Sequence, residues 1–336
     1  MSKKYSVAVV GATGAVGREM MEVLEELNFP VGTLKLLASA KSAGMKLPFK
    51  GQEYVVEELT ENSFGGIEIA LFSAGGSISA KFAPIAAKAG AVVIDNTSHF
   101  RMDPEVPLVV PEVNPDHIKK MKKNIIANPN CSTAQMILPL KALHDAVGLK
   151  RVVVATYQAV AGAGQAGISE LLEQTKAVLD KKSPAPKKFA HAIAFNLIPQ
   201  IDEFIENGYT KEEMKMVNET RKILGDDSIE VSATCVRVPV LVGHSESVNV
   251  ELKKPLTRAQ ATEIIKKFPG IELVDDNAKK QYPMPVNCVG KNPVYVGRIR
   301  QDVSRPNAIE MFVVADNLRK GAALNAVQIA FAYING

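Results

Sequence analysis

The sequence predicts an α/β protein with two domains, and three observations support this prediction. Short apolar strands alternate with helical segments through the first third of the chain, which is the pattern of a parallel sheet covered by helices. A glycine-rich turn joins the first strand to the first helix. The chain has 336 residues, too many for one ordinary domain. We expect an N-terminal Rossmann-like parallel sheet and an α+β domain with a mixed sheet.

Composition and charge are those of an ordinary globular protein. Hydrophobic residues make up 46% of the sequence and charged residues 23%. The net charge of +4 gives no case for nucleic-acid binding but suits anionic, phosphorylated ligands. The three cysteines form neither a disulfide framework nor a Cys-x-x-Cys metal pair, which favours a reducing compartment. Met1 to Lys4 shows no signal-peptide pattern, and no apolar run approaches the roughly 18 residues of a membrane span.

A glycine turn follows the first predicted strand, residues 5–10. Its spacing is Gly-x-x-Gly-x-x-Gly, and the helix after it places apolar residues such as Met20 and Leu24 on one face. A glycine turn alone is a weak signal. Between a strand and a helix it predicts a dinucleotide site whose backbone amides face the pyrophosphate. The predicted contacts are Gly11, Thr13, Gly14, Ala15 and Val16.

The loop after the second predicted strand, residues 34–38, indicates which dinucleotide binds. An enzyme that uses NAD usually has an acid here for the ribose 2′-hydroxyl, but no acid occurs between Leu37 and Gln52. Two hydroxyls and a lysine stand there instead, and they suit the 2′-phosphate of NADP. These residues are Ser39, Lys41 and Ser42. The alternative is a solvated loop lysine without a ligand.

Two further strands end in segments that can approach a ligand. The strand at 67–73 ends in small residues, where Ser73 and Gly75 would let the backbone approach the cofactor. The strand at 91–95 leads into a polar segment that contains His99 and Arg101. His99 could look catalytic, whereas Arg101 is a candidate contact for an anion.

Cys131 is the candidate nucleophile. Residues 124–127 are predicted to form a short buried strand, and a helix runs on through Gln135 and Leu143, so Cys131 lies at a strand-to-helix corner. The partial positive charge of a helix N-terminus lowers a thiol pKa. The alternative is a small buried hydrophobic residue, but the corner position and a distant histidine favour a nucleophile.

The hexapeptide Asn128-Pro129-Asn130-Cys131-Ser132-Thr133 closely resembles the nucleophile motif of the aspartate-β-semialdehyde dehydrogenases. The resemblance covers nearly the whole chain. It implies an NADP-binding domain of residues 1–127, completed by a C-terminal helix at 319–336. It also implies a catalytic and dimerisation domain of residues 128–318.

The resemblance also assigns roles around the nucleophile. Arg101, in the segment Ser-x-Phe-Arg, would bind phosphate near the amide of Asn130. Gln158, which ends a predicted strand, would touch the substrate and the sulfur. Three further residues would contact the nicotinamide half of the cofactor, namely Ala161, Gly162 and Asn317.

Glu212 and Lys215 lie three residues apart on a predicted helix at 210–224. By themselves they indicate a solvated ion pair on one helical face. The segment Glu-Glu-x-Lys nevertheless matches the family, and the resemblance puts Lys215 on phosphate and Glu212 near the substrate amino group.

Arg237 and His244 lie near the end of one predicted strand, residues 232–240, with His244 in a loop before the next strand at 248–252. A lone histidine near a strand end is more often structural than catalytic, but an arginine seven residues earlier favours a site. The resemblance implies that Arg237 holds the substrate carboxylate and that His244 is the acid or base.

The resemblance implies a specific reaction. Aspartyl phosphate would acylate Cys131, and NADPH would reduce the thioester, so that L-aspartyl-4-phosphate becomes L-aspartate 4-semialdehyde. This step belongs to the synthesis of lysine (through diaminopimelate), threonine, methionine and isoleucine. No metal is required. The family further implies a cytoplasmic homodimer or homotetramer with no nucleic-acid or membrane partner.

Two alternative enzyme families differ from this prediction in the sequence around the nucleophilic cysteine, and a third alternative is a relative without activity. An N-acetyl-γ-glutamyl-phosphate reductase shares the Cys–His chemistry but usually reads Asn-Pro-Gly-Cys, and a glyceraldehyde-3-phosphate dehydrogenase carries Ser-Cys-Thr-Thr-Asn. A catalytically silent binding relative would be expected to lose Cys131, Arg237 or His244, and all three are present.

Overall fold

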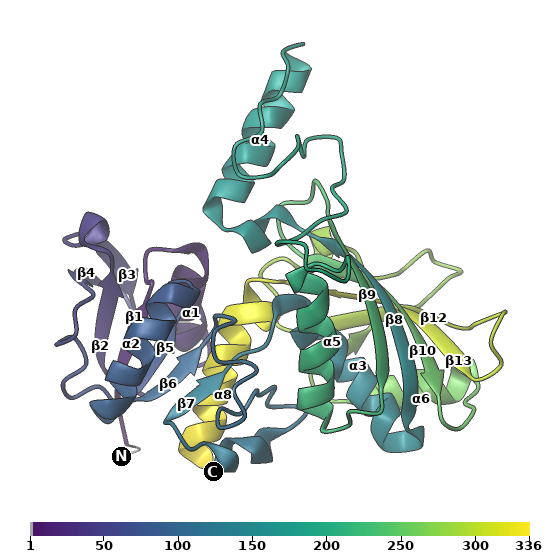
Figure 1. The fold of residues 1–336 in the computed structure, drawn as a ribbon, viewed down its shortest axis with the longest axis horizontal. Coiled ribbons are helices and arrows are strands. Elements are labelled where there is room, and N and C mark those ends of the chain that lie inside the picture. Colours follow the sequence, from purple (N-terminus) through teal and green to yellow (C-terminus); the bar gives the residue numbers. More distant parts are fainter. Residues whose placement is uncertain (1–2) are drawn as a thin grey trace. The chain divides into compact units, whose positions relative to one another are not determined.

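The structure is a computed structural model that describes residues 3–336 (Figure 1). The expectation that the chain starts without a signal peptide therefore falls partly outside it, since Met1 and Ser2 are not among the described residues. The chain forms two compact units. The first contains residues up to Asn130 together with Ala322–Gly336, and the second is Cys131–Gly321.

The first unit is built on a seven-stranded sheet in the order β3-β4-β2-β1-β5-β6-β7. All neighbouring strands are parallel except β3 and β4, which form an antiparallel pair at one edge. The strands are β1 (Tyr5–Val10), β2 (Val31–Ala38), β3 (Lys46–Phe49), β4 (Gln52–Glu58), β5 (Ile69–Phe72), β6 (Val92–Asp95) and β7 (Ile125–Ala127). The helices are α1 (Ala15–Glu26), α2 (Gly76–Lys88) and α8 (Leu324–Asn335), with 3₁₀ turns at Ala40–Ser42 and Pro115–Lys120.

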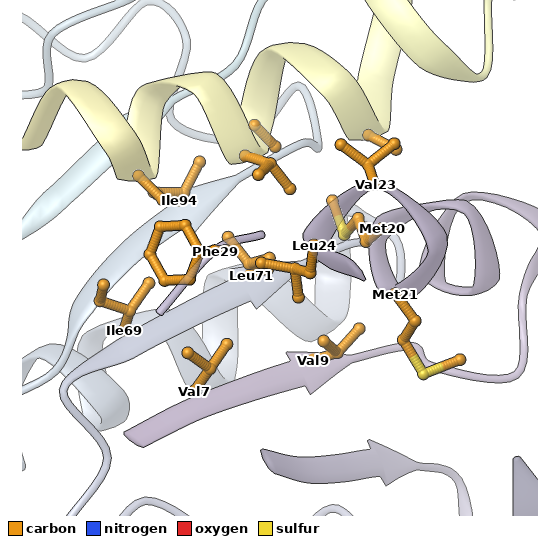
Figure 2. Close-up of a cluster of buried hydrophobic side chains, with 14 of the residues drawn as sticks. Val7, Val9, Met20, Met21, Val23, Leu24, Phe29, Ile69, Leu71 and Ile94 are labelled. Carbon is orange, nitrogen blue, oxygen red and sulfur yellow. The ribbon is translucent and has the colours of Figure 1, made fainter. Parts of the chain in front are cut away.

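The core of the first unit lies between its sheet and the helices α1 and α8. Figure 2 shows Phe29, Leu71 and Ile94 in this layer, beneath the pale yellow helix α8. The Phe29 ring meets Phe331 of α8 edge to face, with 4.8 Å between centroids. The last segment of the chain therefore completes a core that the first segment begins.

The second unit is built on a six-stranded mixed sheet in the order β11-β12-β13-β10-β8-β9. The pairs β8–β9 and β11–β12 are parallel and the others antiparallel. Its strands are β8 (Leu149–Gln158), β9 (Glu230–Arg237), β10 (His244–Leu252), β11 (Ile271–Leu273), β12 (Val294–Gln301) and β13 (Ala308–Ala315). Its helices are α3 (Cys131–Val147), α4 (Gln165–Leu179), α5 (Lys211–Leu224), α6 (Arg258–Lys266) and α7 (Pro285–Cys288), with a 3₁₀ turn at Val160–Ala163.

Local sequence explains where α5 begins and ends and why α3 is buried. Thr210 and Glu213 form a reciprocal capping box at the start of α5, and Gly225 ends the helix in a left-handed conformation. The helix α3 is buried along most of its length and packs on β8 and β10. Cys131 is its first residue, so the buried body of the helix fixes the position of the thiol-bearing end.

The predicted fold class is confirmed, with a parallel sheet in one unit and a mixed sheet in the other. The predicted start of the strand at 248–252 is wrong, because β10 already begins at His244 and pairs there with Ala315. The final helix begins at Arg319 as expected, where Arg319–Ala323 forms a π-helical segment that runs directly into α8. Among residues 3–336, no helix is both long enough and apolar enough to cross a membrane.

The glycine turn generates a test of packing. A Cβ at Gly17 would lie 2.2 Å from the Gly11 carbonyl oxygen, whereas a Cβ at Gly14 would lie 3.4 Å from the same atom. We expect Gly17→Ala to lower the free energy of unfolding by about 1–3 kcal/mol, because the backbone must move apart. Gly14→Ala is the matched control and should change it by less. Equal thermal unfolding of the two variants would contradict this account of the turn.

Candidate functional site

The glycine turn and the loop after β2 come together in the first unit. The Thr13 hydroxyl donates to the Ser42 hydroxyl at 3.4 Å, which joins two segments that the sequence assigns to the cofactor. Ser39 caps the short 3₁₀ turn that carries Lys41, and Lys41 is exposed. The turn therefore presents a cation and two hydroxyls beside the start of α1.

The end of β5 closes on the same turn. Gly11 has φ +87°, and a Cβ there would lie 2.6 Å from the Ser73 carbonyl oxygen, so only glycine allows this approach. Gly75 also has a positive φ, of 96°, and precedes the first residue of α2. Since β1, β2 and β5 are parallel, their ends meet at one edge of the sheet, which is where such sheets bind nucleotides. Ala15 and Val16 open α1 at this edge.

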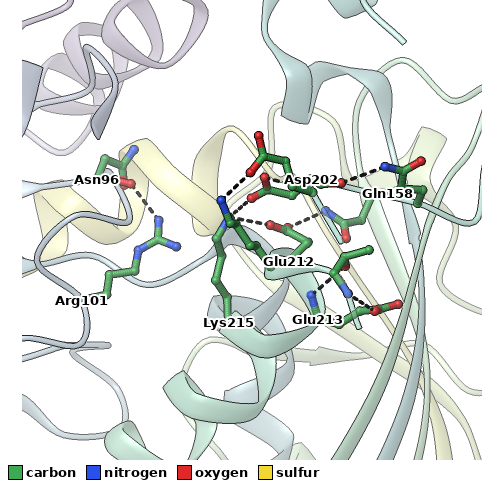
Figure 3. Close-up of polar contacts among 11 residues, drawn as sticks. Asn96, Arg101, Gln158, Asp202, Glu212, Glu213 and Lys215 are labelled. Atoms are coloured by element: carbon green, nitrogen blue, oxygen red, sulfur yellow. Dashed lines mark hydrogen bonds and ion pairs between the residues drawn. The ribbon is translucent and has the colours of Figure 1, made fainter. Parts of the chain in front are cut away.

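The side chain of Arg101 donates hydrogen bonds to backbone carbonyl oxygens of the first unit. Its Nε donates to the carbonyl of Asn128 and its Nη2 to the carbonyl of Asn96, both at 2.8 Å (Figure 3). Its side chain is 7% exposed. Asn128 is fixed in turn by Asn325 of α8, whose amide donates to it at 2.7 Å. These carbonyl partners leave the guanidinium with its positive charge, as an anion site requires.

Buried Asp95 organises the segment that carries Arg101. Its carboxylate accepts hydrogen bonds from the hydroxyls of Ser79 and Thr97, each at 2.8 Å, and from the Thr97 amide. Asn130, the last residue before the nucleophile, is buried in the same unit. His99 is exposed.

Cys131 differs from the other two cysteines in exposure. Cys131 is partly exposed at the start of α3, whereas Cys235 and Cys288 are buried. Burial raises the thiol pKa of Cys235, and it raises that of Cys288 to about 12. Gly321 makes room for the nucleophile, because a Cβ there would lie 2.6 Å from the Cys131 Cβ. Cys131 is thus the thiol whose surroundings suit reactivity.

His244 is fully buried at the start of β10. Its Nδ1 accepts the Ala159 N–H at 3.0 Å, which implies that the neutral ring carries its proton on Nε2. Within residues 3–336, Nε2 has no hydrogen-bond partner. Burial, and to a smaller extent the charge of Arg237, lowers the His244 pKa well below its usual value. The ring is therefore neutral at pH 7, and the hydrogen-bonding capacity of the buried Nε2 is unused.

Arg237 ends β9 and is 6% exposed. Its Nη1 donates to the Ala159 carbonyl at 2.8 Å, and no carboxylate of the described chain forms an ion pair with it. Burial lowers its pKa, while the charges of Glu212 and Cys131 oppose this. Gly162 lies against both functional groups, because a Cβ there would lie 2.9 Å from Arg237 Nη1 and 3.2 Å from His244 Nε2. A buried cation that forms no direct ion pair is suited to bind an anionic ligand.

A chain of polar contacts runs beside these residues (Figure 3). The Gln158 amide donates to Glu212 at 3.1 Å, and its oxygen accepts from the Thr156 hydroxyl. The other oxygen of Glu212 pairs with Lys215 at 3.0 Å, and Lys215 also pairs with Asp202 at 2.8 Å. Burial alone would lower the Lys215 pKa, but the two carboxylates outweigh burial and raise it.

The remaining predicted contacts lie at loops of the second unit. Ala161 and Gly162 belong to the 3₁₀ turn after β8, and the Ala161 amide donates to the Leu241 carbonyl. Asn317 accepts the Gly243 N–H at 2.9 Å, one residue before His244. The backbone that carries the histidine is thus fixed from two sides.

The structure divides the predicted residues between its units. Arg101, Asn130 and the predicted cofactor contacts from Gly11 to Gly75 lie in the first unit. In the second unit, the structure brings together Cys131, Gln158, Ala161, Gly162, Glu212, Lys215, Arg237, His244 and Asn317. Between residues 3 and 336, no cluster of three acidic, histidine or cysteine side chains is arranged to hold a metal.

Sequence reasoning missed several residues that shape this site. Asp202 pairs with Lys215 from an irregular segment, and Gly321 contacts Cys131 from almost two hundred residues away. Glu246 lies fully buried on the same face of β10 as His244, where burial raises its pKa well above the usual value. The acid in the pattern His-x-Glu could have signalled Glu246, but no local pattern marks the other two.

Comparisons with known proteins cover both units. A family model described as semialdehyde dehydrogenase, NAD binding domain, matches residues 6–121. A second, described as semialdehyde dehydrogenase, dimerisation domain, matches residues 140–320. Together they span most of the chain.

Relatives and solved structures extend this match. The aspartate-semialdehyde dehydrogenase of Aquifex aeolicus is 58% identical over 97% of each chain. The structure of aspartate semialdehyde dehydrogenase II from Vibrio cholerae, complexed with ASA, superposes with a TM-score of 0.97 and 53% identity over 99% of each chain. That of the Candida albicans enzyme with NADP has a TM-score of 0.76 and 25% identity over 99% of each chain. Identity above one half along nearly the full length shows that the chain belongs to the aspartate-semialdehyde dehydrogenases, a family of oxidoreductases.

Proposed function

We propose that this protein converts L-aspartyl-4-phosphate to L-aspartate 4-semialdehyde through a thioester on Cys131, with NADPH as reductant. The observation that carries the proposal is the buried Arg237, which forms no ion pair with an acid among residues 3–336 and whose charge interacts with those of Glu212 and Cys131. A small substrate with a carboxylate at one end and a reactive acyl carbon at the other fits this pair. The direct test is NADP reduction with L-aspartate semialdehyde and phosphate. N-acetyl-glutamate semialdehyde, run in parallel, tests the rival reductase.

Cys131 forms and breaks the bond to the substrate. Its place at the first turn of α3 lets the partial positive charge of the helix end stabilise a thiolate. The thiolate attacks the acyl phosphate carbon, and phosphate leaves with the bonding electron pair. NADPH, when bound, would supply a hydride to the acyl carbon. The Cys131 sulfur then leaves with the C–S bonding electrons as a thiolate, which releases the aldehyde.

His244 acts at the substrate oxygen. With the Ala159 N–H on Nδ1, Nε2 carries a proton and donates a hydrogen bond to the oxygen that becomes negative. The role of base requires the other tautomer, in which Nδ1 is protonated and the bond to Ala159 is lost. The geometry therefore supports oxyanion stabilisation as its first contribution and proton transfer as its second.

The two anionic ends of the substrate need separate cations. We assign the α-carboxylate to Arg237 and the phosphate to Arg101, assisted by Asn130. Lys215 already pairs with Glu212 and Asp202, so phosphate reaches it only by competing with Asp202. We assign Glu212 to the substrate amino group, which would share the carboxylate with Gln158 on one oxygen and Lys215 on the other.

The residues of the first unit fit NADP. The missing Cβ at Gly11 lets the end of β5 lie against the turn, and Lys41, Ser39 and Ser42 stand where an acid would repel a 2′-phosphate. We assign residues 1–127 and 319–336 to the NADP-binding domain and residues 128–318 to the catalytic and dimerisation domain. The matched dimerisation family supports an oligomer, which we propose to be a homodimer or homotetramer. Free cysteines suit the cytoplasm.

Cys131→Ala should lower kcat by more than about a thousandfold and leave NADP binding intact, because no other exposed thiol replaces the nucleophile. At pH 7.5, iodoacetamide should label Cys131 at least on the order of tenfold faster than Cys235 or Cys288, whose pKa values are raised. Peptide mapping by mass spectrometry measures the order of labelling. Substantial turnover by Cys131→Ala would remove Cys131 from this role.

Lys41→Glu should weaken NADPH binding on the order of tenfold, because a carboxylate would face the 2′-phosphate. NADH binding should change little or improve. Titration of cofactor fluorescence measures both affinities, and Lys46→Glu, which alters an exposed lysine on β3, is the control. Equal affinity of the unmodified enzyme for NADP and NAD would overturn the assignment of this loop.

Arg237→Lys keeps the charge but loses the planar fork, so it should raise the semialdehyde KM and lower kcat. Arg101→Leu should chiefly raise the phosphate KM and still permit one round of acylation. Steady-state kinetics with one substrate varied at fixed levels of the other separates the two effects. An exchange of the two phenotypes would mean that the assignment is reversed.

A further inference from the structure

An irregular segment is fastened to α4 close to Arg237. Residues 180–210, described throughout, contain no helix or strand. Within them, residues 185–194, here called the strap, are held by two side chains one helical turn apart on α4, Glu170 and Gln174. Both side chains are buried, although most of the strap is exposed.

Both ends of the strap are bound through its backbone. Glu170 accepts the amides of Lys187, at 3.1 Å, and of Lys188. The oxygen of Gln174 accepts the amides of Ile193 and Ala194 at 2.8 and 3.2 Å. The Gln174 amide donates to Glu170 at 2.8 Å, which links the two anchors. Release of the strap would leave the buried Glu170 carboxylate without these hydrogen bonds, which would cost free energy. The bonds therefore hold the backbone of the strap in place.

Phe189 lies between these two anchored ends. Its neighbours Lys188 and Ala190 are exposed, but its own ring is half-buried. The ring packs against an apolar cluster that includes Val160 and Leu171. Its centroid is 5.9 Å from the guanidinium carbon of Arg237, within the range of a cation–π contact.

The surroundings of Arg237 leave some of its hydrogen-bond donors without a partner in the described chain. One nitrogen, Nη1, is occupied by the Ala159 carbonyl. The aromatic ring lies within cation–π range of the guanidinium, whose Nη2 and Nε donors lie in its own plane. Planar donors in a water-poor setting favour a planar, bidentate acceptor, and a carboxylate is such a group.

We propose that the strap holds Phe189 on Arg237 and makes Phe189 a residue that selects aldehydes bearing an α-carboxylate. The proposal rests on the proposed function, in which Arg237 binds that carboxylate. Phe189 acts on the substrate through Arg237, by orienting the guanidinium and keeping water from it. It is a positioning residue and not a catalytic one.

Phe189→Leu keeps apolar volume but loses the aromatic face. We expect it to raise the KM for L-aspartate semialdehyde three- to tenfold, with kcat within twofold and the phosphate KM unchanged. Preference for this substrate over 3-aminopropanal, which lacks the carboxylate, should fall by the same factor. Phe189→Tyr, which keeps the aromatic ring, should leave the semialdehyde KM and the preference over 3-aminopropanal as in the unmodified enzyme. Phe195→Leu alters an exposed ring close to the strap and should leave them unchanged.

The effect of Phe189 should depend on Arg237. In an Arg237→Lys background, Phe189→Leu should change the semialdehyde KM by less than twofold. An unchanged KM in Phe189→Leu alone, or an undiminished effect in the lysine background, would overturn the proposal. If the unmodified enzyme fails to reduce NADP with the semialdehyde, the proposed function itself fails. If it succeeds and Phe189→Leu is silent, only the inference about the strap fails.

A matched pair of acids tests the anchoring. Glu170→Gln removes the buried charge that binds the strap and should reproduce the rise in KM, with faster hydrogen exchange at the Lys187 and Lys188 amides. Glu173→Gln lies on the same helix but loses only an exposed pair with the Lys187 side chain, so it should do neither. Identical KM values and identical hydrogen exchange in the two variants would contradict the proposal that Glu170 anchors the strap.

Discussion

A buried positive charge that forms no ion pair among residues 3–336 is the constraint on which the candidate site of the second unit depends. Arg237 is almost fully buried, and its hydrogen bond goes to a neutral carbonyl. Such a cation costs free energy until an anion arrives. The surrounding residues keep this state in place: Gly162 leaves space beside the guanidinium, and Phe189 approaches it. The same charge helps to keep His244 neutral. Stability is thus exchanged for readiness to bind a carboxylate.

Features set by neighbouring residues could be predicted from the sequence. The glycine turn, the Cys131 corner and the parallel sheet follow from apolar periodicity and from glycine and proline positions, and the fold class is confirmed. The family is confirmed as well, since the hexapeptide around Cys131 is a specific motif. The start of β10 was misplaced, because Gly243-His244-Ser245 resembles a loop locally, and pairing with Ala315 decides that it is a strand.

Contacts between distant segments could not be predicted in this way. Gly321 has no local feature that marks its packing on Cys131, and Asp202 lies in a stretch without periodicity. The Pro- and Lys-rich composition of residues 181–188 is typical of an exposed linker, yet the amides of Lys187 and Lys188 are held by buried Glu170. Composition describes the side chains of this stretch, which are largely exposed, but not its backbone, which is bound.

Ala159 joins the two ends of the candidate site through its own main chain. Its N–H binds the imidazole of His244 and its C=O binds the guanidinium of Arg237. The backbone of one residue therefore sets the spacing between the imidazole and the guanidinium. That spacing does not depend on the side chain at position 159. Under the proposed function, in which the two groups bind opposite ends of one substrate, the path of the chain between β8 and the turn at Val160–Ala163 limits the carbon-chain length that fits.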